Sequence, residues 1–540
     1  MRDAHSFLLI LPASILVASV CLPNSWVNAH VVKFRQLVTA VAGLQWVVAG
    51  CFTVALLAGW MQTIHSVLVR IVSPLEVTVY YDGAASLMFA LVSFVGWVIC
   101  CYSIRYLDGE ATQGRYFRWT AFTIGSVLLT VVSGNLLMFV AAWIMTSLGL
   151  HQLLLHYGHR PAAKRAAWTK FTISRIGDAA LIGSMVIISN EFNTLDFAEL
   201  FAAAGTLANI TPAIHAAGFL LIAGAVTKSA QFPFHTWLPQ TMETPTPVSA
   251  LMHAGIVNAG GYLIIRTSPL VALTPWALTT LALIGGFTTC FAAVVMLTQT
   301  SIKKSLAYST IAQMGFMLLQ CGLGAYSAAM LHILAHSLYK AHAFLSSGGV
   351  IAERFATSVS PPANHSVTAV KLAIVGSILA ALLGVSLTMF GIDPITKTGG
   401  LLLAGVLCLA LTHWMGQVMR TGNQTLMIRA MLIAGGLCVV YSASYFAVDK
   451  IVVANLPDSS VPKLAWLVAA VVLAGFLGMF ALNLVLASGR VPPALNKWQI
   501  HASNGFYMEH AIRRVFEPIA IRFAGFVSSV SLKPLPKESL

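Results

Sequence analysis

The most regular feature of this chain is a succession of apolar runs of about 20 residues, separated by short polar segments. Each run predicts a membrane-spanning helix, because about 20 helical residues cross the hydrocarbon core of a bilayer. About fifteen runs meet this criterion. They begin near Ser6, Leu37, Ala84, Trp119, Leu136, Phe171, Ala213, Val248, Trp276, Ser305, Ala329, Val370, Gly400, Leu426 and Leu464. The pattern predicts an all-α polytopic membrane protein, and we interpret the first run as a spanning helix because it lacks a convincing signal-peptide cleavage site.

The composition supports this class. Hydrophobic residues make up 58% of the 540 residues, only 9% are charged, and the mean hydropathy is +0.82. A water-soluble surface is not built from so few charged residues. We predict one transmembrane domain over 1–487 and a cytoplasmic amphipathic tail over 488–540 that binds a partner.

The formal net charge of +14 would suggest a nucleic-acid partner in a soluble chain, but here its distribution between loops sets the orientation. Alternate loops are basic, and the intervening loops are acidic. The basic loops hold Lys33, Arg35, Arg105, Arg115, Arg118, Arg160, Lys164, Arg165, Lys170, Lys303, Lys304, Arg354, Lys371, Arg420, Arg429, Arg490, Lys497, Arg513 and Arg514, and the acidic ones Glu76, Asp82, Glu191, Asp196, Asp393, Asp449 and Asp458. Basic loops favour the cytoplasm, so we expect a bacterial inner-membrane protein with a periplasmic N-terminus and a cytoplasmic C-terminus.

Motifs for metals, nucleotides and redox cofactors are missing from the sequence. The eight cysteines form no C-x-x-C pair and do not group with histidines at metal-ligand spacing. No glycine-rich phosphate loop follows a strand. The sequence therefore implies no metal, no cofactor and no ATP-driven pumping by this chain alone.

Lys228 is the most informative residue, because it lies in an apolar stretch that runs from about 213 to 232. An ammonium group in hydrocarbon costs several kcal/mol unless partners or water accompany it. The stretch breaks at Pro233 and resumes as a second apolar span over about 248–265. A charged residue beside a broken helix indicates an ion path.

Other polar residues also fall inside predicted spans, namely His253 and the set His332, His336 and Lys340. Residues four apart share a helix face, so this set forms a stripe about 12 Å long. Histidine titrates near neutrality, and a desolvated lysine can load and release protons, so the stripe is a plausible proton wire. Two alternatives stay open, a purely structural role between helices and haem ligation by His332 or His336.

Several long motifs in this chain resemble the antiporter-like subunits of respiratory complex I and of Mrp-type cation antiporters. They are 174–178, 228–239, 242–254, 304–315 and 332–340, and the resemblance covers roughly 82–351. It implies two inverted five-helix repeats, over about 119–266 and 275–420, each with a discontinuous helix.

The resemblance also implies roles for individual residues. Lys228 corresponds to the central lysine of the first broken helix and Lys340 to the connecting lysine of the second repeat. His253, His332 and His336 match positions that line the polar axis. The supporting motif residues are Arg175, Asp178, Glu243 and Lys304.

The chain departs from complex I subunits at three places. Trp143 is followed by Ile144 instead of a glutamate, so Lys228 either pairs with another carboxylate, such as Asp178 or Glu243, or deprotonates more easily. In the second repeat, Lys371 or Lys397 would have to replace a charged residue. The segment 501–532 replaces a long lateral helix and reads as an in-plane or partner-binding amphipathic helix, with packing on the chain's own loops as the alternative.

These departures make the chain similar to DabB-type membrane subunits of the inorganic carbon accumulation complex. That resemblance implies a proton-conducting subunit that drives a DabA-like cytoplasmic zinc protein, related to carbonic anhydrase, with catalysis in the partner. Protons are favoured over sodium because intramembrane carboxylates are few. The alternatives are a subunit of an NADH or ferredoxin:quinone oxidoreductase and an Mrp-like cation/proton antiporter subunit.

Overall fold

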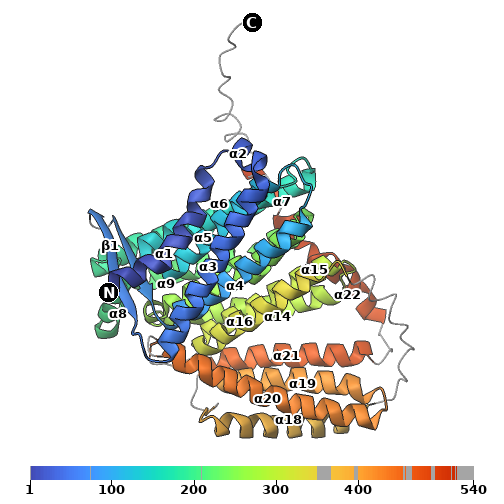
Figure 1. The fold of residues 1–540 in the computed structure, drawn as a ribbon. Helices are drawn as coiled ribbons and strands as arrows, with labels where there is room; N and C mark the ends of the chain where they lie inside the picture. The colour runs from blue at the N-terminus through green and yellow to red at the C-terminus, as the bar shows by residue number, and fades with distance from the viewer. Residues whose placement is uncertain are drawn as a thin grey trace.

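A computed structural model of the chain describes residues 2–519 apart from 73–74, 208, 350–366, 394–398, 454–455, 458–464, 488–492, 513 and 517. Within these residues the chain is a helical bundle with one β-hairpin (Figure 1). Its first helices are α1 (Arg2–Ala18), η1 (Ser19–Cys21), α2 (Asn24–Ala29), α3 (Val31–Leu57), α4 (Gly83–Tyr106), α5 (Gln113–Val132), α6 (Leu136–Leu154), α7 (Pro161–Phe192) and α8 (Phe197–Thr206).

The hairpin joins β1 (Ile64–Val72) to β2 (Leu75–Tyr81), antiparallel, with Ile64 opposite Tyr81 and Val67 opposite Thr78. It was not expected from the apolar runs. Asn135 anchors it, since its Nδ2 donates to Glu76 O and to Thr78 Oγ1, both at 2.8 Å. The same side chain caps α6 by accepting from Met138 N. One residue therefore fixes both the hairpin and the start of α6.

The middle of the chain is broken into short helices, as the sequence predicted around Pro233. These are α9 (Pro212–Lys228), η2 (Phe234–Thr236), α10 (Trp237–Gln240), η3 (Thr241–Glu243), α11 (Thr246–Ala254), η4 (Ile256–Asn258), α12 (Ala259–Arg266) and α13 (Ser268–Val271). Pro233 has no N–H to continue α9. A second break lies between α11 and α12, at Gly255.

The remaining described helices are α14 (Pro275–Leu297), α15 (Ile302–Gly322), α16 (Tyr326–Leu345), α18 (Ala369–Met389), α19 (Gly400–Met419), α20 (Gln424–Val452), α21 (Ala465–Ala487), α22 (Pro493–Ser503) and η6 (Gly505–Tyr507). The helices α14 and α15 pack closely at two glycines. A Cβ on Gly285 would lie 2.5 Å from Gly315 O. This contact excludes larger residues at Gly285.

Among the described residues, eleven helices are long and apolar enough to cross a membrane. The other predicted spans correspond to α5, α9, α15 and α16, which are helical as well but shorter or more polar. The polytopic helical class is thus confirmed, while the count of about fifteen spans and the inverted repeats stay predictions.

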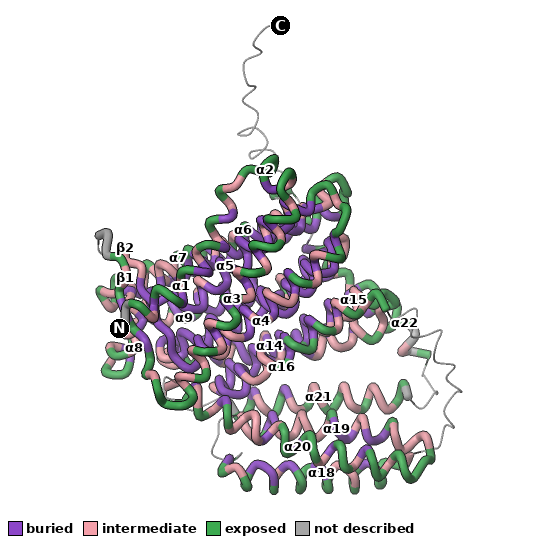
Figure 2. Tube along the Cα trace, in the orientation of Figure 1, coloured by how far each residue is buried: buried purple, intermediate pink, exposed green. Residues whose placement is uncertain are grey.

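The bundle has two ends, shown at the left and right of Figure 1. We call the end with β1, β2 and α8 the hairpin end, and the opposite end, with α22, the tail end. Buried residues concentrate in the helices from α4 to α16, whereas α18 to α21 are largely exposed or intermediate (Figure 2). A membrane surrounds such exposed apolar faces favourably.

Some sequence predictions fall outside the described residues, namely those on Arg354, Lys397, Asp458, Arg490, Arg513 and segment 520–540. Lys371 lies exposed in the first turn of α18. It therefore occupies a helix end instead of a helix centre.

Candidate proton path

Lys228 ends α9 and points its ammonium group at α6. Its Nζ donates to Thr146 Oγ1 at 2.7 Å, to Ser147 Oγ at 3.0 Å and to Trp143 O at 3.3 Å. The ammonium also lies 4.4 Å from the centroid of the Trp143 ring, a cation–π contact. Lys228 is only 6% exposed. Hydroxyl and carbonyl dipoles thus take the place of the missing glutamate.

A second buried lysine, Lys170 of α7, meets the same turn of α6. Its Nζ donates to Ser147 O at 2.8 Å, and the residue is 2% exposed. We had assigned Lys170 to a basic loop, and the structure corrects this, because α7 begins at Pro161 and carries Lys170 into the core. Ser147 therefore joins two buried ammonium groups, one through its hydroxyl and the other through its carbonyl. In the sequence, Lys170 follows a group of basic residues and directly precedes an apolar run, so it could not be distinguished from a loop residue.

The supporting residues lie in different surroundings. Arg175 and Asp178 form an ion pair on α7, with Arg175 Nη2 and Asp178 Oδ2 2.5 Å apart. Glu243 pairs at the surface with Arg160 at 3.1 Å, and Lys304 is exposed at the start of α15. Among the described residues, no carboxylate oxygen lies within 4.0 Å of Lys228 Nζ. Asp178 acts on Lys228 by longer-range attraction, and Glu243 is bound elsewhere.

The sequence neighbours of Lys228 and His336 also form hydrogen bonds between elements of the bundle. Ser229 Oγ donates to Val257 O at 2.7 Å, next to the break between α11 and α12. Asn258 Nδ2 then donates to Ser337 Oγ of α16, also at 2.7 Å. Ser337 is the neighbour of His336. These hydrogen bonds were not predicted, because serine and asparagine are too common in helices to stand out in a sequence.

The second half of the path gathers the histidines and Lys340 around α15 and α16. His253 Nδ1 bonds Thr310 Oγ1 at 3.1 Å, and its ring stacks on Phe344 at 4.3 Å. Lys340 is fully buried, and its Nζ donates to Leu306 O at 3.2 Å. His336 is 5% exposed and interacts electrostatically with His253 and Lys340. The structure brings these three residues together as expected.

His332 completes the stripe. Its Nδ1 lies 3.1 Å from Gln320 Oε1, and its ring centroid is 6.0 Å from that of His336. His253 Nε2 and His336 Nε2 are buried without a protein hydrogen-bond partner among the described residues. A neutral imidazole nitrogen without a protein partner carries either a lone pair that can accept a proton or an N–H that can donate one.

At the hairpin end the buried charge is fully paired. Arg266 donates from Nη1 to Asp82 Oδ2 at 2.9 Å and from Nη2 to Asp82 Oδ1 at 3.1 Å. Arg266 also donates to Tyr262 Oη, which in turn donates to Val131 O. Sequence reasoning had placed Asp82 in a loop and had overlooked Arg266. A bidentate pair of this kind fixes the start of α4 against the end of α12.

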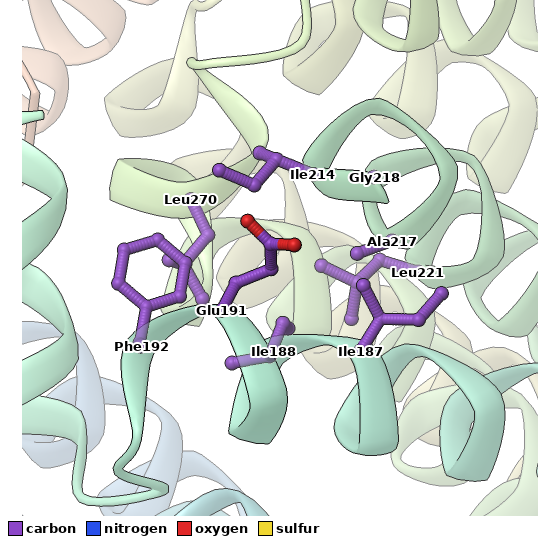
Figure 3. A pocket seen from close by; sticks show the side chains of 9 residues that line it. All are labelled: Ile187, Ile188, Glu191, Phe192, Ile214, Ala217, Gly218, Leu221 and Leu270. Carbon is purple, nitrogen blue, oxygen red and sulfur yellow. The ribbon is translucent and has the colours of Figure 1, made fainter. Parts of the chain in front are cut away.

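A separate small pocket lies between α7 and α9 (Figure 3). Its lining is apolar apart from the Glu191 carboxylate, which accepts a hydrogen bond from Thr211 at 2.8 Å. None of the path residues lines this pocket. Among the described residues, no three His, Cys, Asp or Glu side chains form a metal-binding group.

A helical membrane bundle with broken helices and a buried series of lysines and histidines defines an antiporter-like membrane subunit. Residues 133–389 match the family model "NADH:quinone oxidoreductase/Mrp antiporter, TM", and residues 71–117 match "NADH-Ubiquinone oxidoreductase (complex I), chain 5 N-terminus". The solved structure of an Mrp complex from Dietzia sp. has the same fold, with a TM-score of 0.58 at 20% identity over 99% of this chain and 64% of that one.

Two relatives show which kind of antiporter-like subunit this chain resembles over its whole length. NADH-quinone oxidoreductase subunit L of Escherichia coli is 39% identical over 272 residues, which are 50% of this chain but only 44% of that protein. The probable inorganic carbon transporter subunit DabB2 of Halothiobacillus neapolitanus is 36% identical over 536 residues, 96% of this chain and 93% of that protein. The chain belongs to the DabB family.

Proposed function

We propose that this chain conducts protons across the bacterial inner membrane and thereby drives accumulation of inorganic carbon by a cytoplasmic, zinc-dependent partner related to carbonic anhydrase. Lys228, His253, His332, His336 and Lys340 would carry the protons, with Lys170 beside the first lysine. The observation that carries the proposal is that Lys228, His253, His336 and Lys340 are buried inside the bundle, with half-buried His332 beside His336.

The geometry supports proton transfer better than sodium binding. Sodium needs several oxygen ligands, and membrane sites supply them from carboxylates and unwound carbonyls. Here the buried carboxylates Asp82 and Asp178 are paired with arginines, and the path itself offers nitrogen atoms. A proton that crosses 100 mV releases about 2.3 kcal/mol, which shifts a hydration equilibrium by more than tenfold.

The Lys228→Ala variant tests the proposal in a host that lacks its own carbonic anhydrase and grows in air only when it accumulates inorganic carbon. Together with the zinc partner, the wild-type chain should rescue growth, and Lys228→Ala should abolish the rescue. Lys33→Ala is the matched control, since Lys33 is an exposed lysine at the start of α3, outside the path, and its loss should change nothing. Full rescue by Lys228→Ala would refute the role of this lysine.

The oxidoreductase alternative makes a different prediction. The family models cover complex I subunits, but the relative of that type aligns over half of this chain, whereas DabB2 aligns over nearly all of it. A quinone-linked subunit would purify with flavin or iron–sulfur proteins, and a DabB-type subunit with one soluble zinc protein. The proposal therefore predicts zinc, and neither flavin nor iron, in the native complex.

A further inference from the structure

The described part of the tail, residues 493–512, 514–516 and 518–519, reaches the break that follows Lys228. We call this part the tail segment. The ring centroid of Phe506 lies 5.7 Å from that of Phe291 on α14, and that of Phe516 lies 6.4 Å from that of Phe234 in η2. Gln299 Nε2 at the end of α14 donates to Ser503 O at 3.3 Å. The tail segment is thus seated on the tail end of the bundle.

Its inward face joins an aromatic cluster that contains the broken helix itself. Phe291 lies 5.1 Å from His235 and 6.0 Å from Phe232, measured between ring centroids. Phe232 and His235 stack at 5.9 Å. Phe232 is four residues after Lys228, so a shift of Phe506 or Phe516 would be passed through packed rings to the end of α9.

The turn of the tail segment is held in an unusual conformation. Gly505, Phe506 and Tyr507 have φ values of 57°, 52° and 60°. Left-handed backbone is unfavourable for residues with a Cβ, and it persists only where the surroundings fix it. Here Phe506 is fixed by Phe291, and a Cβ on Gly505 would lie 3.0 Å from Tyr308 Oη. Loss of these contacts would release the turn.

The tail segment also carries a set of exposed apolar side chains, which we call its outward face; one of them, Trp498, lies 6.2 Å from Phe506 between ring centroids. Trp498, Ile500 and Val515 are each about 60% exposed, and Tyr507 and Ile519 are 49% and 40% exposed. Contiguous exposed apolar residues mark interaction sites.

We propose that the tail segment is the coupling element of this protein: its outward face binds the soluble zinc partner, and its inward face transmits that binding to the broken helix at Lys228. This inference rests on the proposed function. It adds the docking surface and the residues, Phe506 and Phe516, through which the partner and the path communicate.

Charge on the tail end supports a protein partner with an acidic face. Lys164, Arg165, Lys304, Lys497 and Arg514 are exposed there. The acidic residues of the same loops are already bound within the chain, namely Asp108 to Arg35, Glu110 to His156 and Glu243 to Arg160. An acidic rim around an apolar centre would complement this surface.

The first experiment tests docking with the full-length chain and the purified zinc partner in native membranes. The variant Ile500→Ser with Val515→Ser should weaken partner binding at least tenfold, while Gln499→Ser, an exposed polar neighbour, should bind as the wild type does. A photo-crosslinker introduced as Trp498→p-benzoylphenylalanine should crosslink to the zinc partner. Crosslinking to lipid alone, or equal binding by all variants, would overturn the proposal.

The second experiment separates coupling from docking. Phe506→Leu should keep partner binding and lower carbon accumulation at least fivefold. Phe291→Leu, which changes the α14 ring that Phe506 contacts, should have the same two effects. Wild-type accumulation of inorganic carbon by both variants would show that the tail segment does not couple partner binding to the path. The proposed function would still stand if Lys228→Ala were inactive in the same assay, and it would fail if Lys228→Ala were active.

Discussion

At the scale of single residues, the chain stabilises a buried ammonium without a neighbouring carboxylate. Lys228 is surrounded by the hydroxyls of Thr146 and Ser147, the carbonyl of Trp143 and the indole face of the same residue. Dipoles hold an ammonium less tightly than a carboxylate does, so less free energy is needed to remove its proton. This arrangement favours a lysine that exchanges protons.

The Thr146→Val variant tests this arrangement. Valine keeps the volume but removes the shortest of the three hydrogen bonds, at 2.7 Å, and a hydrogen bond to a buried charge contributes about 1.5–3 kcal/mol. The free energy of unfolding in detergent should fall by about that amount, and proton flux should fall with it.

The control for this variant is Thr279→Val, because Thr279 is exposed and its hydroxyl donates only to Pro275 O within α14. It should leave both stability and flux unchanged. If Thr146→Val behaves in the same way, the hydroxyl does not hold Lys228.

Sequence reasoning singled out the charged candidates for the proposed path but not the small polar residues that contact them. Lys228, His253, His336 and Lys340 stood out because charge or imidazole in an apolar run is costly and therefore informative. Thr146, Ser147 and Asn258 carry no such signal, and their roles depend on which helices meet. The counter-charge proposed for Lys228 at Glu243 was wrong for the same reason, since the ion pair with Arg160 forms between distant segments.

At the scale of elements, the hairpin is fixed to α8 by a titratable contact. His65 Nε2 of β1 lies 2.8 Å from Asp196 Oδ2, and Asp196 caps α8 by accepting from Ala198 N. The hydrogen bond to Asp196 raises the pKa of His65 above 6.5. Burial raises the pKa of Asp196, but the contact with His65 and the hydrogen bonds from the backbone N–H groups of Ala198 and Glu199 together outweigh this effect and lower that pKa below 3.8.

These shifts predict a pH dependence. The contribution of His65 to the free energy of unfolding is fully present below pH 6.5 and is lost as the pH rises through the pKa of His65 in the folded protein. The contribution of Asp196 is present above pH 3.8 and is lost as the pH falls through the pKa of Asp196 in the folded protein. Thermal stability should therefore fall slightly from pH 6 to pH 9, and His65→Asn should reduce this fall.

His30→Asn is the matched control, because His30 lies at the other end of the bundle and bonds only Trp26 O. Its pH dependence should equal that of the wild type. An unchanged pH dependence in His65→Asn would show that the contact contributes nothing.

The elements differ in how far the sequence predicts them. Apolar runs located a helix at every predicted span, because hydrophobicity over about 20 residues is a strong local signal. The hairpin was missed even though Val77 and Val79 alternate with polar residues, since a short amphipathic strand carries a weak signal beside long apolar runs. Lys170 was misplaced because α7, with 32 residues, begins well before its apolar part.

At the scale of the whole molecule, contacts between distant segments join the elements around the path residues. The bonds from Ser229 to Val257 and from Asn258 to Ser337 join α9, η4 and α16, and the tail segment closes over the first break. No local pattern predicts such a connection. The resemblance to antiporter-like subunits supplied the order of the helices, and the structure supplied the contacts.

The most direct test of the buried proton path is proton flux into liposomes that contain the complex of this chain with its zinc partner. A potassium diffusion potential, negative inside, would drive the flux, and a trapped pH dye would report it with bicarbonate and CO2 present. The wild type and Lys33→Ala should acidify the lumen at equal rates, while Lys228→Ala and Lys340→Ala should each retain less than a tenth of that rate. Equal rates in all four proteins would contradict the account.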